Sequence, residues 1–168
     1  AEFLFNLKAM DVNGSQDYLK IGLELIYKAV AIDPNCQHAY QVMSWACLLR
    51  HDEKEFHRSV EKMLMINPYN AMYSAEAGFG YICIGEYEKG LQYITDSLPL
   101  NPYYPWNINV GLCLYYLKFM DYDEALYWAN LINRPALLWD SLLKTATLGL
   151  LGNTTDAVPF IAKIYTLS

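Results

Sequence analysis

The residues best suited to acid–base chemistry are three histidines, His38, His51 and His57, which lie in one stretch of the chain. On a helix, His57 would stand one turn from Glu53 and from Glu61, and pairs at that spacing are ordinary surface contacts. No motif for an activated nucleophile, no phosphate-binding loop and no paired carboxylates in an apolar setting accompany these histidines. The sequence therefore predicts a protein that is not an enzyme.

The cysteines are the other residues that could bind a metal or react. Cys36, Cys47, Cys83 and Cys113 are scattered, and no two of them form a CxxC pair. Cys36 and His38 could begin a metal site, but no second pair follows at a ligand spacing. We interpret the four cysteines as small buried hydrophobic residues of a protein in the reducing cytoplasm. No metal and no cofactor are predicted.

Composition and charge exclude several classes of protein. Hydrophobic residues make up 54% and charged residues 18% of 168, which is too apolar for a disordered chain. The net charge of -6 is shared evenly between the two halves, and no run of Lys or Arg offers a surface for nucleic acid. The longest weakly charged stretch, Pro99–Phe119, contains Lys118, asparagines and further prolines, which suits a buried helix better than a membrane span.

A repeat organises the chain. Asp33-Pro34, Asn67-Pro68 and Asn101-Pro102 place prolines 34 residues apart, and Asx-Pro ends a helix in a turn. Second turns are expected midway between these stops, at 85–87, 120–122 and 152–154, and each is followed by a small residue. Each unit is therefore a helix, a tight turn, a second helix and a stop.

The pattern predicts an all-α fold of about five helix-turn-helix units, at 1–34, 35–68, 69–102, 103–135 and 136–168. The expected helices are 1–11, 15–32, 36–51, 53–67, 70–84, 86–98, 105–119, 121–133, 136–151 and 154–167. Apolar residues recur at three and four along them, and stacking of the units buries these residues in one continuous core. Small residues at Gly22, Gly90, Ala125 and Ala157 let helices approach closely. Phe56 takes this place in the second unit, where we expect a wider helix pair with Phe56 filling the gap.

The sequence resembles a tetratricopeptide repeat domain. The resemblance is carried by Ala77-Gly78-Phe79-Gly80-Tyr81 and by the following Gly85-Glu86-Tyr87-Glu88-Lys89-Gly90, with Pro68 and Pro102 where that family ends a repeat. It covers almost the whole chain; the first unit fits least, and the fourth has a one-residue insertion near 103–105. The resemblance implies a right-handed α-α superhelix and a cytoplasmic scaffold for protein–protein interaction.

The stretch 104–167 is also similar to the C-terminal repeat regions of bacterial signalling proteins. Those proteins join tetratricopeptide repeats to a class III nucleotide cyclase or to a winged-helix DNA-binding domain. The chain begins at Ala1 and ends at Ser168 without the polar end that repeat arrays need for solubility, so we expect a fragment of a longer protein.

In the resembled family the first helix of each unit lines a concave groove. That geometry puts in the groove His38, Gln41, Trp45 and Leu48, then Met72, Ala75, Phe79 and Ile82, then Asn107, Val110, Leu114 and Lys118, and finally Trp139, Leu142 and Ala146. Some members clamp a C-terminal carboxylate with Lys, Asn and Arg, but Gln41 and Trp45 hold clamp positions here. Lys118 is the one cation of the set, so an apolar or aromatic segment, such as a helix, fits better.

A structural interpretation competes with the groove for three of these aromatic residues. Trp45, Phe79 and Trp139 also fit a position in the core, against the next unit. Three functions follow from the sequence. The first is an adaptor that binds a partner protein or peptide; the second is a regulatory or dimerising module, as a homodimer or beside a cyclase or DNA-binding domain. A small-molecule sensor ranks third.

Overall fold

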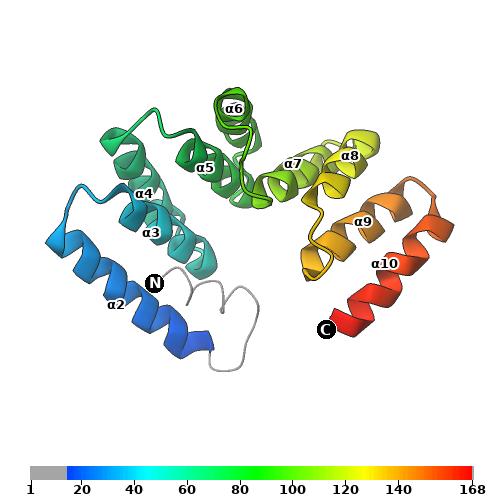
Figure 1. Ribbon diagram of the computed structural model, residues 1–168, viewed down its shortest axis with the longest axis horizontal. Coiled ribbons are helices and arrows are strands. Elements are labelled where there is room, and N and C mark those ends of the chain that lie inside the picture. The colour runs from blue at the N-terminus through cyan, green and yellow to red at the C-terminus, as the bar shows by residue number, and fades with distance from the viewer. Residues whose placement is uncertain (1–14, 168) are drawn as a thin grey trace.

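The computed structural model describes residues 15–167, which form helices joined by short turns (Figure 1). Its α-helices are α2 (Ser15–Ile32), α3 (Gln37–Arg50), α4 (Glu53–Ile66), α5 (Ala71–Cys83), α6 (Tyr87–Ser97), α7 (Asn107–Lys118), α8 (Tyr122–Ile132), α9 (Leu138–Leu150) and α10 (Thr154–Leu167), with a 3-10 turn at Leu98–Leu100. No strand occurs in this part of the chain. The predicted all-α class is confirmed, and the helix ends agree with the prediction within two residues. The helix expected at 1–11 lies outside the described residues.

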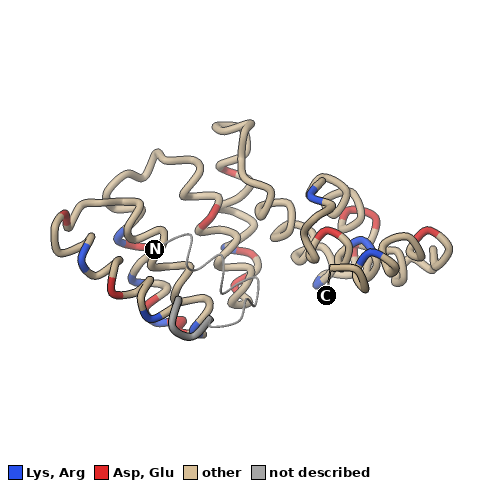
Figure 2. The backbone as a smooth tube through the Cα atoms, turned by 60° about the horizontal axis from the view of Figure 1, so that its bottom comes forward, with Lys and Arg blue, Asp and Glu red and all other residues tan. Residues whose placement is uncertain are grey.

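The helices associate as successive pairs that follow one another along an arch (Figure 1). The closest associations are α3 with α4, α5 with α6, α7 with α8, and α9 with α10. The first helix of each pair also packs against the first helix of the next, so that α3, α5, α7 and α9 form a continuous row, with α2 against α3. Lys, Arg, Asp and Glu are intermixed over both halves of the arch (Figure 2).

The turns between one pair and the next repeat a single hydrogen bond. In each Asx-Pro turn a side-chain oxygen accepts from the backbone N–H two residues later, at 2.9 Å for Asp33, 3.1 Å for Asn67 and 3.1 Å for Asn101. The side chain thereby satisfies a backbone donor that no helix uses, while the proline prevents the helix from continuing. The predicted stops at these three positions are confirmed.

The turns within each pair repeat a backbone conformation. His51, Gly85, Met120 and Gly152 have φ values of 55°, 90°, 61° and 79°. This left-handed region costs glycine nothing, whereas a side chain is crowded there. The turns predicted at 85–87, 120–122 and 152–154 are therefore present, and His51 marks a fourth.

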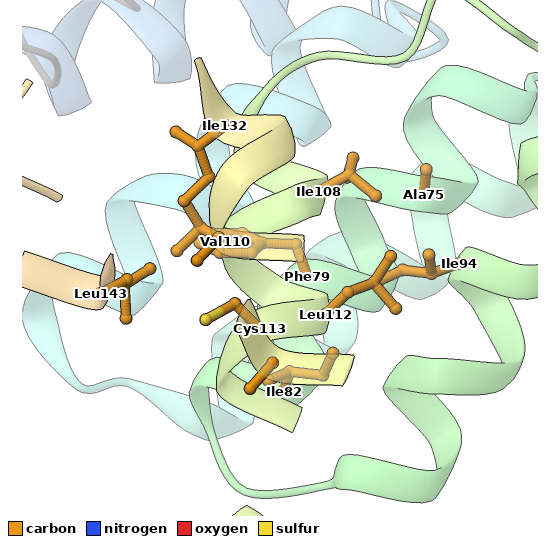
Figure 3. Close-up of a cluster of buried hydrophobic side chains, with 12 residues drawn as sticks. Ala75, Phe79, Ile82, Ile94, Ile108, Val110, Leu112, Cys113, Ile132 and Leu143 are labelled. Atoms are coloured by element: carbon orange, nitrogen blue, oxygen red, sulfur yellow. The ribbon is translucent and has the colours of Figure 1, made fainter. Parts of the chain in front are cut away.

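Two clusters of buried side chains fill the arch. The N-terminal core consists of Ile26, Val42, Met43, Ala46, Cys47, Phe56, Val60, Met63, Ala77 and Tyr81. The C-terminal core, shown in Figure 3, consists of Ala75, Phe79, Ile82, Ile94, Ile108, Val110, Leu112, Cys113, Ala125, Ala129, Ile132 and Leu143. Helix α5 contributes to both cores, with Ala77 and Tyr81 on one face and Ala75, Phe79 and Ile82 on another.

Small residues make room for these contacts. A Cβ atom on Gly78 would lie 2.7 Å from the carbonyl oxygen of Gly90, so the backbones of α5 and α6 meet at their glycines. Ala125 is fully buried in the third of the described pairs. Phe56, expected to fill a gap in its own pair, is 1% exposed and gains its space from the next unit, because a Cβ on Gly80 would lie 2.6 Å from the Phe56 ring.

Candidate partner-binding surface

The residues predicted to line a groove fall into three classes of exposure. The exposed ones are His38, Met72, Lys118, Trp139, Leu142 and Ala146. The half-buried ones are Trp45, Leu48 and Leu114. The buried ones are Gln41, Ala75, Phe79, Ile82, Asn107 and Val110.

The buried set corrects the sequence-based assignment. A Cβ atom on Gly111 of α7 would lie 2.9 Å from the Phe79 ring and 3.6 Å from Ile82. The same Phe79 ring also lies 5.3 Å from the Trp45 ring of α3. Phe79 and Ile82 therefore fill the space between successive first helices. Like the other four buried residues, they offer little surface to a partner.

Trp45, Phe79 and Trp139, which fitted either the core or the groove, differ in their exposure. Phe79 is 8% exposed and belongs to the C-terminal core, and Trp45 packs against that core while half-buried. Trp139 is 48% exposed. Tyr81 is 2% exposed, and its ring lies 5.4 Å from that of Phe56 and 5.5 Å from that of Tyr93. Of the three groove candidates, only Trp139 presents its ring at the surface.

The α3 and α5 part of the predicted groove contains two polar contacts between side chains. The Nδ1 atom of His38 lies 3.1 Å from the Tyr73 hydroxyl, and the two rings stack. The Gln41 amide nitrogen donates to a carboxylate oxygen of Glu76, which crosses from α3 to α5. The Oε1 atom of Gln41 is buried as well and accepts no hydrogen bond from the described residues.

The α9 part of the predicted groove is apolar. Leu138, Trp139 and Leu142 are 38%, 48% and 37% exposed, and Ala146 one turn later is exposed too. Residues at this spacing share one side of a helix, and we call these four residues the α9 face. Leu138 was not among the predicted residues, although it adjoins Trp139. The α9 face thus carries the largest apolar contribution among the candidates.

An ion pair on the buried side of α9 was not predicted from the sequence. The Lys144 Nζ atom donates to both carboxylate oxygens of Asp140, at 2.9 Å and 3.0 Å. Asp140 is 2% and Lys144 9% exposed. The same carboxylate accepts the Arg134 backbone N–H at 3.2 Å, and Lys144 Nζ lies 5.4 Å from the centre of the Phe160 ring. The pair joins the α8–α9 loop, α9 and α10, and its only signal was an Asp and a Lys four residues apart.

The histidine predicted to pair within its own helix pairs elsewhere. The His57 Nε2 atom lies 2.8 Å from a carboxylate oxygen of Glu86, at the start of α6, and not against Glu53 or Glu61. On α4, His57 can contact the next unit as well as residues of its own helix. Sequence spacing alone does not show which residue of the next unit lies nearby. Among residues 15–167, no three His, Cys, Asp or Glu side chains are arranged to hold a metal ion.

The cysteines do not share one environment, contrary to the expectation that all are buried. Cys47 and Cys113 are buried, Cys36 is half-buried and Cys83 is exposed. Burial raises the pKa of the Cys47 thiol to about 11, with the Asp52 and Glu55 carboxylates adding to the effect. Burial likewise raises the pKa of Cys113 to about 11. At neutral pH both thiols therefore stay protonated and are poor nucleophiles.

In the described part of the chain, no helix combines the length and hydropathy that crossing a bilayer requires. No family model matches the sequence, and the curated proteins include no match to it.

Proposed function

We propose that this chain is a tetratricopeptide-type superhelix that acts as a non-catalytic scaffold and binds an apolar segment of a partner protein through the concave side of its first helices. Support for the architecture comes from the helix pairs, from the turn residues at recurring positions and from the three Asx-Pro stops. The α9 face is the principal contact surface, and the half-buried Leu114 on α7 and the exposed Met72 on α5 lie further along the row of first helices.

The observation that carries this proposal is an uncovered position on α9. Ala75, Val110 and Leu142 each lie ten residues before the left-handed residue of the following turn. Ala75 and Val110 are 1% and 3% exposed, whereas Leu142 is 37% exposed. Trp139 is similarly open at 48%; at the same place Asn107 in α7 is 7% exposed and Met72 in α5 is 39% exposed. The position of Leu142, which is buried in α5 and in α7, is thus uncovered on α9.

The chemistry of the α9 face indicates the kind of segment it would bind. An exposed Trp with two Leu side chains and a small Ala offers an apolar stripe, and the small Ala146 leaves room for another backbone at its C-terminal end. Such a stripe suits an amphipathic helix that contributes its own apolar residues at a spacing of three or four. Contiguous apolar surface on a soluble domain commonly marks an interaction site.

The test is a selection of helical peptides followed by a matched pair of variants. Peptides with an apolar stripe are selected against the purified chain, and their affinity is measured by fluorescence anisotropy. Leu142→Glu is expected to weaken the best peptide by roughly tenfold or more, because it buries a charge in the contact. Leu131→Glu is the control, since Leu131 is 41% exposed on α8, outside the α9 face. The proposal fails if no peptide is selected, or if both variants bind as the wild type does.

The second candidate function is a regulatory or dimerising module beside a cyclase or a DNA-binding domain in the same polypeptide. The observation that favours it is an exposed apolar side of α10, with Val158 and Tyr165 59% and 80% exposed. Reading the full-length open reading frame separates the two candidates: an effector domain in the same gene supports the second.

A further inference from the structure

A cavity of about 300 Å³ lies where the α3–α4 turn meets the C-terminal end of α5. It is lined by residues of these three helices and of the turns after α3 and α5: Cys47, Leu48, His51, Asp52, Glu53, Phe56, Cys83 and Ile84. Thiol, aliphatic and aromatic side chains form most of the lining, and His51, Asp52 and Glu53 supply its polar part. We call it the α3–α5 cavity. Its volume is at the lower end of the range for small-molecule sites, about 300–1,000 Å³.

The next junction of the array shows what can occupy this place. Two residues after the left-handed residue of the turn, the second unit has the exposed Glu53, whereas the third and fourth units have the half-buried Tyr87 and Tyr122. The Tyr87 ring lies 6.0 Å from the Phe119 ring. Phe119 corresponds to Ile84, because each directly precedes a left-handed residue. An aromatic ring thus packs between α5 and α7 at the position where the cavity lies between α3 and α5.

The later junction also brings a cation to its ring. The Lys118 Nζ atom lies 5.7 Å from the centre of the Tyr87 ring, within the range of a cation–π contact. Lys118 corresponds to Cys83, because each lies two residues before a left-handed residue. The α3–α5 cavity therefore lacks both the ring and the ammonium group that the chain itself supplies one unit later.

The charges around the cavity favour a cation. Asp52 and Glu53 carry carboxylates, and neither forms an ion pair with another residue of the described chain. Helices α3 and α5 end at the cavity while only α4 begins there, and a helix carries a partial negative charge at its C-terminus. Burial raises the pKa of the Cys47 thiol to about 11, and the Asp52 and Glu55 carboxylates add to the rise more than Arg50 opposes it. The potential at this wall of the cavity is therefore negative.

We propose that the α3–α5 cavity binds a small aromatic amine in its protonated form, with the ring against the apolar wall and the ammonium group at the Glu53 carboxylate. The ring of such a ligand takes the place that Tyr87 fills at the next junction. The contact between ammonium group and carboxylate gives the site its preference for a cation over an uncharged aromatic molecule. This inference is independent of the α9 face and of the segment that binds there.

The first experiment measures the binding of three probes to the purified chain by ligand-observed NMR titration at pH 8, where histidine side chains generally carry little charge. Tyramine supplies the ring and the ammonium group, 4-ethylphenol the ring alone, and N-acetyltyrosinamide the ring as it occurs within a protein. Tyramine is expected to bind, and both uncharged probes to bind roughly fivefold more weakly or less tightly still.

Three results of this titration would overturn the proposal. Tyramine that does not bind removes the site. Binding of 4-ethylphenol as tight as that of tyramine removes the preference for a cation. Binding of N-acetyltyrosinamide tighter than that of tyramine assigns the cavity to an aromatic side chain of a partner protein instead of a small amine.

The second experiment locates the site with variants of Glu53, whose exposed position should tolerate both substitutions. Glu53→Tyr installs the residue type of the third and fourth units and should fill the cavity, so that tyramine binds roughly tenfold more weakly or not at all. Glu53→Gln keeps the shape and removes the charge, and should weaken tyramine roughly fivefold while leaving 4-ethylphenol unchanged. Glu61→Tyr, at an exposed position of the same helix, is the control and should bind tyramine as the wild type does.

Circular dichroism verifies that each variant folds. Tyramine binding that Glu53→Tyr leaves unchanged overturns the assignment to this cavity. A Glu53→Gln variant that binds tyramine as tightly as the wild type overturns the contact between the carboxylate and the ammonium group.

Discussion

The N-terminal and C-terminal cores solve the same packing problem with different side chains. In the N-terminal core the Phe56 ring lies against Gly80, and the Tyr81 ring stacks on that of Tyr93. In the C-terminal core the residues after the turn are the fully buried Ala125 and Ala129, which bring α8 close to its neighbours. The comparison teaches that the period of the array determines where helices begin and end. It does not determine which of two packed helices supplies the large side chain and which supplies the small one.

The surfaces over the two cores also differ in their side chains. The α3 and α5 side carries the contacts of His38 with Tyr73 and of Gln41 with Glu76. The α9 face exposes leucines and a tryptophan above the buried pair of Asp140 and Lys144. Buried polar residues thus occur in both halves, with Gln41 5% and Asp140 2% exposed, and Asp140 of the C-terminal half is a charged residue with a charged partner.

The largest expected effect comes from breaking that interior pair. Lys144→Met should lower the free energy of unfolding by about 3–5 kcal/mol, since it leaves the Asp140 carboxylate buried without its cation. Asp140→Asn with Lys144→Met should recover much of the loss, because an amide oxygen can still accept the Arg134 N–H. Urea denaturation measures all three proteins. Arg134→Met keeps that backbone donor and is the control. A single Lys144→Met variant as stable as the wild type would mean that water reaches the pair.

A smaller effect distinguishes the aromatic contacts of the two cores. Gly80→Ala should cost about 1–3 kcal/mol, because its Cβ would lie 2.6 Å from the enclosed Phe56 ring and the core would be overpacked. Gly111→Ala should cost less, since its Cβ would lie 2.9 Å from the Phe79 ring, which is 8% exposed against 1% for Phe56, while the preference of a helix for alanine over glycine, about 0.8–1 kcal/mol, offsets part of the cost at both positions.

Thermal and urea unfolding compare the two alanine variants. Phe56→Leu should partly rescue Gly80→Ala, because the smaller side chain vacates the space, and should have no such effect on Gly111→Ala. Equal losses for the two alanine variants would remove the distinction between the cores.

The smallest effect is a gain in stability at the turns. Met120→Gly should stabilise the protein by about 0.5–1 kcal/mol, because φ at this position is 61° and a side chain is crowded there. His51→Gly should act in the same direction in the N-terminal half. Met120 is 74% exposed, so the loss of its side chain removes little packing. Melting temperatures of the two variants measure the gain; a decrease at either position would show that the side chain contributes more than its backbone strain costs.

The helices were predictable because their ends are determined locally. Asx-Pro stops and Gly turns act through the residues around them, so a single sequence contains the signal. The binding surface was only partly predictable. Ala75, Val110 and Leu142 occur at equivalent positions of their helices, and their exposure differs because α7 and α9 cover two of them while no described helix covers the third. Helical spacing identifies the side of a helix but not what lies against it.

The contacts between units were the least predictable. His57 pairs with Glu86 across units, although its own helix offers two carboxylates at a suitable spacing. Asp140 and Lys144 are buried although such residues at a spacing of four commonly lie at a helix surface. In both cases the decisive neighbour lies on another helix, and its position depends on the angle at which the units stack.

Helix α5 has a further consequence for how the molecule unfolds. It supplies side chains to both cores, so neither core can be dismantled at α5 without loosening the other. In repeat arrays each unit otherwise contacts and stabilises only its neighbours, so units can unfold from the ends. The amide protons of α5 should therefore be among the slowest to exchange with solvent, and fraying that begins at α2 or α10 should stop at this shared helix.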